Sequence, residues 1–302
     1  MRTSGLSPQL VGILAMSAAG FVFSCHDAIT KYLSPHYPLG EIIFFRQLTS
    51  TIILTVYVLF TTGLQTYRVS NIPGQVGRAL LFAISTTLIA TSVMVLPLAT
   101  ALAIVFASPL LVAALSATAL GEPVGPRRWA AIIAGFIGVV IIIRPGDTSF
   151  TWLLLIPVAA ASASALRDVV TRILHRTDNT NSILFWSNIA IMLATLCSLP
   201  YGWAQIAPFH IGIIILAGAL NLLAHFLMIT ALRLGDAALV TPFRYTSLVW
   251  AAVLGYIIWD HIPDEFTVLG GSIIVAAGIY LVIRESQVKA RAAAHEAKQT
   301  AD

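Results

Sequence analysis

The sequence predicts an all-α integral membrane protein of ten transmembrane helices, arranged as two inverted five-helix repeats. Three observations predict it: the composition, ten long apolar segments, and a similarity between the two halves of the chain. Of the 302 residues, 58% are hydrophobic and only 10% are charged, whereas soluble domains carry about 25% charged residues. So few charges could not cover a soluble core of this size, and a soluble enzyme is therefore excluded.

Ten segments are long and apolar enough to cross the roughly 30 Å hydrocarbon core of a bilayer. They cover residues 9–30, 40–62, 76–95, 97–119, 127–144, 151–172, 181–201, 209–232, 236–258 and 266–284. The first exceeds the apolar core of a signal peptide, about 7–15 residues, so we expect it to be a transmembrane helix. Residues 286–302 are rich in alanine and charge and are predicted to form a cytoplasmic tail.

The distribution of lysine and arginine predicts the orientation. If both termini are cytoplasmic, the outer side holds only Lys31 and Arg144. The other lysines and arginines near the ends of the segments, Arg78 among them, then lie on the cytoplasmic side. This asymmetry follows the positive-inside rule and predicts that both termini are cytoplasmic. It also accounts for the net charge of +4, so nucleic acid is not an expected partner.

The two halves of the chain resemble each other. The stretch that begins at His26 is matched 141 positions later by the stretch that begins at Arg167. The matched pairs are Asp27 with Asp168, Thr30 with Thr171, Lys31 with Arg172, and Phe44 with Phe185. Each half, residues 8–145 and 150–285, would hold an odd number of spans, so the second would enter the membrane from the opposite side. Inverted repeats of this kind are typical of secondary transporters, with the substrate site near the midplane.

Short motifs add a family resemblance. With D-A-I-T-K at residues 27–31, F-F-R at 44–46 and L-G-E-P at 120–123, residues 8–285 resemble the drug/metabolite transporter superfamily, in particular its EamA-type permeases. The second half departs from the pattern, with W-D-H-I-P at residues 259–263 in place of G-E-P.

The resemblance implies a transporter of small molecules. Most members of this branch export amino acids, so we expect amino-acid export, aromatic ones included, by alternating access as a facilitator or exchanger. Residues 15–33 also resemble importers of nucleotide-like metabolites such as S-adenosylmethionine, and this is the alternative.

Polar residues inside the predicted spans are candidates for substrate contact, because a charged side chain at the bilayer centre costs about 2.5–3.5 kcal/mol. Arg244 lies near the middle of the ninth span, where it could bind a carboxylate or serve a structural role. Asn221 and His225 share a face of the eighth span; they could line a cavity or join helices. A serine and several aromatic residues inside the spans are added to these candidates. The expected substrate-binding residues are therefore Ser24, Trp186, Asn221, His225, Arg244, Tyr245 and Trp250.

A second set is expected to act in gating or structure. Asp27 and Lys31 have the i,i+4 spacing of a helical salt bridge, and Asp168 and Arg172 repeat it. Arg46, inside the second span, is expected to be structural, with substrate contact or an outer gate as alternatives.

Several features are missing from the sequence. No ATP-binding lysine loop occurs, and Cys25 and Cys197 lack metal-site spacing, so no cofactor and no metal are expected. No pair of carboxylates lies at mid-membrane, which favours transport without a coupling ion. The expected partners are a small-molecule substrate and the lipid bilayer, and the expected state is a monomer or weak homodimer.

Overall fold

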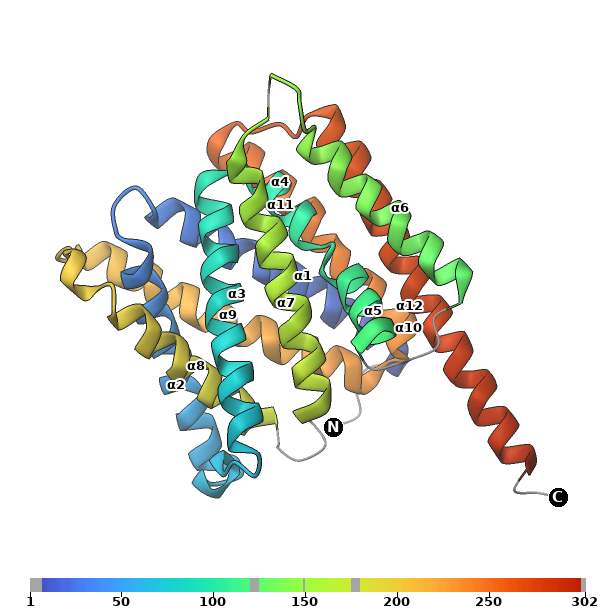
Figure 1. Ribbon diagram of the computed structural model, residues 1–302. Helices are drawn as coiled ribbons and strands as arrows, with labels where there is room; N and C mark the ends of the chain where they lie inside the picture. Colours follow the sequence, from blue (N-terminus) through green and yellow to red (C-terminus); the bar gives the residue numbers. More distant parts are fainter. Residues whose placement is uncertain (1–6, 120–124, 149, 175–179, 300–302) are drawn as a thin grey trace.

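The computed structural model describes residues 7–119, 125–148, 150–174 and 180–299, and within these ranges all regular structure is helical (Figure 1). The α-helices are α1 (Pro8–Leu33), α2 (Leu39–Thr61), α3 (Ile72–Val95), α4 (Leu98–Val105), α5 (Ser108–Ala119), α6 (Pro126–Ile143), α7 (Leu155–Leu174), α8 (Thr180–Leu196), α9 (Pro208–Leu234), α10 (Ala237–Val240), α11 (Thr246–Trp259) and α12 (Glu265–Gln299). The 3-10 helices are η1 (Leu64–Tyr67), η2 (Trp152–Leu154), η3 (Leu199–Tyr201) and η4 (Thr241–Tyr245).

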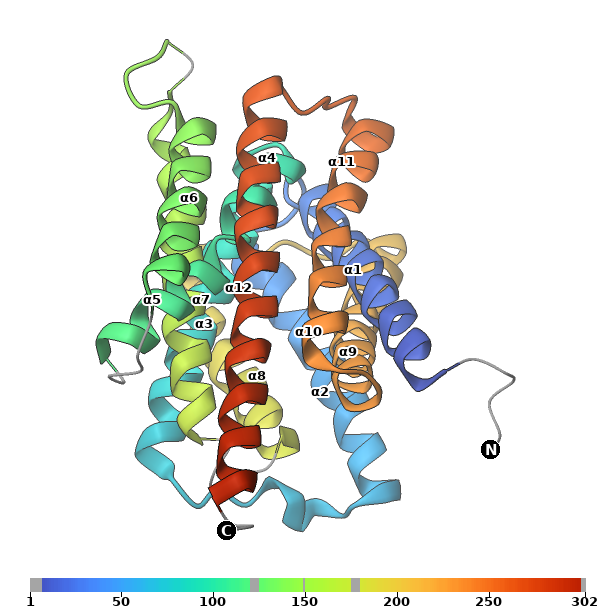
Figure 2. The ribbon, with the colours of Figure 1, turned by 90° about the vertical axis from the view of Figure 1, so that its right-hand side faces the viewer.

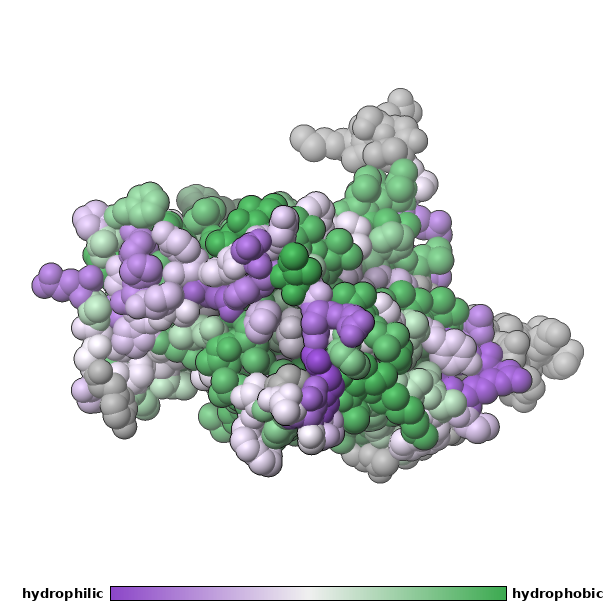
Figure 3. Space-filling view, turned by 90° about the horizontal axis from the view of Figure 1, so that it is seen from above, coloured by the Kyte–Doolittle hydropathy of each residue, from purple (hydrophilic) through white to green (hydrophobic). Residues whose placement is uncertain are grey.

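The helices have the length and composition of membrane spans. Within the described ranges, 8 helical segments are long and apolar enough to cross a bilayer. Large hydrophobic side chains lie exposed on the surface, among them Phe60, 86% exposed, and Ile257, 69% exposed. Figure 3 shows patches of hydrophilic residues between broad hydrophobic areas on one face. An integral membrane protein explains such exposure, because lipid tails solvate these side chains.

Two predicted spans are interrupted, and the expectation of one continuous helix for each was wrong. The fourth breaks between α4 and α5, and the ninth consists of α10, η4 and α11. The cause is proline: Pro109 and Pro242 have no N–H to donate to the carbonyl four residues earlier, and their rings crowd that carbonyl. Residues 286–299 of the predicted tail are helical. They extend α12 to Gln299, and this end of the helix projects from the bundle (Figure 1).

Helices from the two halves of the chain are intermixed. Helix α1 packs along α9 and α11, while α3 packs along α7 and α8. Helix α2 contacts both α8 and α9, and α6 lies beside α12 (Figures 1 and 2). Each of these groups, α6 with α12 included, combines helices from the first and the second half of the chain.

Glycine allows the closest of these contacts. Gly138 on α6 faces Gly270 on α12, and a Cβ added at Gly138 would lie 2.7 Å from the Gly270 carbonyl oxygen and 3.0 Å from Ile274. Small residues at such positions let membrane helices approach backbone to backbone.

Replacing Gly138 by leucine should therefore separate α6 from α12. Overpacking a close contact costs about 1–3 kcal/mol, so we expect Gly138→Leu to lower the melting temperature of the purified protein in detergent. Gly77→Leu on α3 is the matched control, because a Cβ at Gly77 meets nothing within 4 Å. Equal melting temperatures for the two variants would contradict this description of the interface.

Candidate functional site

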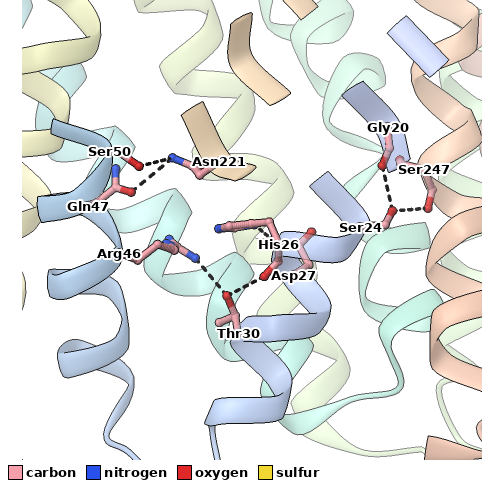
Figure 4. A network of polar contacts seen from close by, with 10 residues as sticks. All are labelled: Gly20, Ser24, His26, Asp27, Thr30, Arg46, Gln47, Ser50, Asn221 and Ser247. Atoms are coloured by element: carbon pink, nitrogen blue, oxygen red, sulfur yellow. Dashed lines mark hydrogen bonds and ion pairs between the residues drawn. The ribbon is translucent and has the colours of Figure 1, made fainter. Parts of the chain in front are cut away.

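A polar cluster joins α1 to α2 in the interior (Figure 4). The Nδ1 atom of His26 lies 3.1 Å from Oδ1 of Asp27. The Thr30 hydroxyl donates to the His26 carbonyl at 3.1 Å and accepts from NH1 of Arg46 at 3.2 Å. His26, Thr30 and Arg46 are buried, whereas the Asp27 side chain is 15% exposed. These hydrogen bonds satisfy part of the polar groups of the cluster, which matters because the hydrocarbon of a bilayer offers polar groups no partners.

Three amide side chains continue the cluster toward the second half of the chain. Nε2 of Gln47 donates to Oδ1 of Asn188 at 2.8 Å, and Asn221 donates to Gln47 and to Ser50 at 3.4 Å. Gln47 and Asn188 are 141 positions apart, which is the spacing between the matched stretches of the two halves. Thr51 and Met192, in contact at 3.9 Å, have the same separation of 141. Corresponding residues of α2 and α8 therefore touch each other.

A second cluster joins α3 to α7 and α8. Arg78 donates from Nε to the Thr171 hydroxyl at 2.7 Å, from NH1 to the Ile183 carbonyl at 3.3 Å, and also to the Ser187 hydroxyl. The sequence placed Arg78 at the cytoplasmic end of the third span, and the structure adds that its side chain is buried inside the bundle. Thr171 corresponds to Thr30, so a guanidinium binds the matching threonine in each half.

The ion pairs expected within the matched motifs differ from those in the structure. Asp168 pairs with Arg167, at 2.8 Å, as Asp27 pairs with His26. Among the described ion pairs none joins Asp27 to Lys31, and the predicted i,i+4 bridge is wrong there. The side chain of Arg172 lies outside the described residues.

Lys31 instead caps the end of α3. Its Nζ donates to the carbonyls of Val93 at 2.9 Å and Leu96 at 2.5 Å. Val93 needs this partner because Pro97, four residues later, has no N–H. The ammonium also lies 5.5 Å from the centre of the Trp259 ring. Lys31 thus ties α1 to the ends of α3 and α11, which would suit a gate.

The two interrupted helices meet near the middle of α1. Phe106, at the break between α4 and α5, lies 5.3 Å from the Tyr245 ring and 5.8 Å from the Arg244 guanidinium, both on η4. Tyr245 is buried and Arg244 is exposed. Ser24 bonds α1 to this region, since its hydroxyl lies 2.8 Å from the Ser247 carbonyl and 3.0 Å from that of Gly20.

The remaining predicted residues lie apart from one another. His225 packs edge-on against Phe23 at 5.1 Å. Trp186 is exposed and donates to the Tyr67 carbonyl at 2.9 Å, near η1. Trp250 is exposed on α11 and packs against Phe21 at 4.8 Å. Substrate contact by these residues stays a prediction.

A groove of about 540 Å³ lies between α2, α9 and residues 203–206. The residues of α2 that line the groove, among them Glu41, Phe45 and Ile52, lie on one face of the helix. Arg46 and Gln47 lie on a different face and do not line it. Ile52 and Ile215 in this lining are exposed, so the groove opens at the surface of the bundle and is separate from the interior clusters.

Inspection of the sequence missed the roles of Gln47, Asn188 and Arg78. The repeat spacing contained the signal for the first two, because the offset pairs an amide with an amide. No group of three metal-binding side chains occurs among the described residues.

Interrupted helices beside buried polar groups are typical of membrane transporters. The sequence pattern of the EamA-like transporter family matches residues 10–144 and again residues 150–284. The chain belongs to this family, within the drug/metabolite transporter superfamily.

Characterised relatives match nearly the whole chain. It is 28% identical to the S-adenosylmethionine uptake transporter of Rickettsia prowazekii, over 97% of this chain and 99% of that one. It is 27% identical to the riboflavin transporter of Rhizobium johnstonii, over 92% and 93%, and 27% identical to the pseudopaline exporter of Pseudomonas aeruginosa, over 89% and 95%. A solved crystal structure shares the fold at 18% identity, with a TM-score of 0.63 over 90% of this chain and 94% of that one.

The amide pair between the halves should be energetically coupled. Replacing one partner leaves the other unsatisfied in the interior, at a cost of about 1–3 kcal/mol. We expect Gln47→Leu and Asn188→Leu each to lower the melting temperature in detergent. The double variant should be more stable than the sum of the two losses predicts, because neither amide is then left unpaired. Strict additivity of the two effects would show that the bond contributes nothing.

Proposed function

We propose that the protein is an alternating-access carrier of ten spans in two inverted halves, residues 8–145 and 150–285. Under this proposal α8 and the interrupted unit of α10, η4 and α11 are the two spans beyond the 8 long apolar segments. The two family matches support it, as does the contact of residues 141 apart on α2 and α8, since corresponding residues can touch only near a symmetry axis. An inward-open and an outward-open state would then arise by exchange of conformations between the halves.

We propose uptake of S-adenosylmethionine, or of a closely similar nucleoside-bearing metabolite, as the function. The observation that carries this is the match over nearly the full length of this chain to an S-adenosylmethionine uptake transporter. The membrane would be a bacterial inner membrane with both termini cytoplasmic, and transport would proceed as facilitation or exchange without a coupling ion.

Amino-acid export, the first expectation from the sequence, receives less support. It drew on Arg244 and nearby aromatic residues, and Arg244 is exposed against Phe106 rather than set within the interior clusters. None of the three relatives described above carries the name of an amino-acid exporter. The test of function therefore includes amino acids as competing substrates.

The test is uptake of radiolabelled S-adenosylmethionine into proteoliposomes that contain the purified protein. With no imposed ion gradient, we expect saturable uptake that accelerates when the vesicles are preloaded with unlabelled substrate. Unlabelled S-adenosylmethionine should compete far better than riboflavin or phenylalanine. Vesicles without protein give the background.

Uptake of phenylalanine, with no uptake of S-adenosylmethionine, would replace the proposal by an amino-acid carrier. Uptake that requires a proton or sodium gradient would overturn the coupling-free mechanism. Uptake that rises linearly with concentration and never saturates would contradict a carrier altogether.

A further inference from the structure

The cluster between α1 and α2 leaves two strongly polar atoms without a partner. Nε of Arg46 and Nε2 of His26 are buried and have no hydrogen-bond partner in the described part of the protein. The two residues are only 3% and 6% exposed. A buried donor or acceptor left unpaired costs about 1–3 kcal/mol, and more for a charged group, so this arrangement requires an explanation.

The neighbouring acid does not neutralise Arg46 directly. Asp27 pairs with His26, and no described ion pair joins Asp27 to Arg46. The guanidinium is permanently charged and offers five N–H donors in a planar fork that fits a carboxylate. The one described hydrogen bond of its side chain goes to the Thr30 hydroxyl, which leaves donors for an anion.

The unpaired nitrogen of His26 is a hydrogen-bond acceptor, whereas the unpaired nitrogen of Arg46 is a donor. A carboxylate can only accept hydrogen bonds, so Nδ1 is the donor toward Asp27. In a neutral imidazole with Nδ1 protonated, Nε2 is an acceptor. Figure 4 shows the imidazole of His26 and the guanidinium of Arg46 pointing toward one another from α1 and α2. A donor fork therefore faces an acceptor.

We propose that Arg46 and His26 hold an α-amino-acid head group, with the carboxylate on Arg46 and the amino group on Nε2 of His26. In such a head group the two functions are attached to the same carbon, which suits adjacent side chains that face each other. The inference deepens the proposed function and rests on it: S-adenosylmethionine and free amino acids carry this group, whereas riboflavin does not.

The test is equilibrium binding to the purified protein with ligand pairs that differ only in the carboxylate. The first pair is S-adenosylmethionine and its decarboxylated form, and the second is phenylalanine and phenethylamine. We expect the wild type to bind the carboxylate-bearing member of a pair more tightly. Arg46→Gln should weaken that member about 10- to 100-fold and leave the decarboxylated member unchanged.

Two further variants separate recognition from folding. Arg78→Gln is the matched control, a buried arginine whose partners are all within the protein, and it should preserve the discrimination. Arg46→Lys keeps the charge without the planar fork and should retain part of it. His26→Phe should weaken phenylalanine but not 3-phenylpropionate, which lacks the amino group.

The outcomes distinguish this inference from the proposed function. Equal binding of S-adenosylmethionine and its decarboxylated form by the wild type would overturn the head-group site and leave the substrate proposal standing. Discrimination between phenylalanine and phenethylamine, with no binding of S-adenosylmethionine, would support the site and overturn the substrate. An equal loss of both members in Arg46→Gln would make Arg46 structural, and failure to bind any of the four ligands would overturn both proposals.

Discussion

The hydrogen bond between Gln47 and Asn188 is the contact on which the arrangement of the interior depends. Amide side chains in the hydrocarbon region cannot form hydrogen bonds with bulk water, so each needs a partner inside the protein. Their bond of 2.8 Å fixes where α2 crosses α8, and Asn221 brings α9 to the same point. The polar clusters lie next to this crossing, since α1 is bonded to α2 through Thr30 and Arg46 and α3 packs along α8.

Similar chemistry in the two halves is achieved with different residues. In one half, Arg46 on α2 reaches the threonine of the matched motif, while in the other half Ser187 stands at the corresponding position of α8 and Arg78 comes from α3. A carrier that alternates between two states does not need identical halves. The cluster around Arg78, whose Nε and NH1 have partners on α7 and α8, is suited to holding helices together. The cluster around Arg46, whose Nε has no partner in the described part of the protein, is the one proposed to hold a ligand.

Composition and the apolar segments were sufficient to predict a helical membrane protein, because lipid exposure imposes long apolar segments on every span. The EamA family came from the resemblance of short motifs and not from composition. Composition and the apolar segments did not predict the breaks in the fourth and ninth spans, although Pro109 and Pro242 were visible, since proline is tolerated in many membrane helices. Burial of Arg78 escaped prediction because a charge six residues into a helix can snorkel to the interface or turn inward. Only packing decides between these outcomes, and the partners on α7 and α8 lie about a hundred residues away.

We propose that the halves exchange conformations about the crossing of α2 and α8, and cysteine cross-linking tests this most directly. In a background without Cys25 and Cys197, one variant carries Thr51→Cys and Met192→Cys, corresponding positions in contact near the proposed axis. The other carries Lys31→Cys and Leu96→Cys, where α1 is tied to the end of α3. After bridging by a short bifunctional thiol reagent, we expect the first variant to keep transporting and the second to stop, with recovery on cleavage of the bridge. Transport blocked at the crossing but unaffected by the bridge at Lys31 would contradict the account.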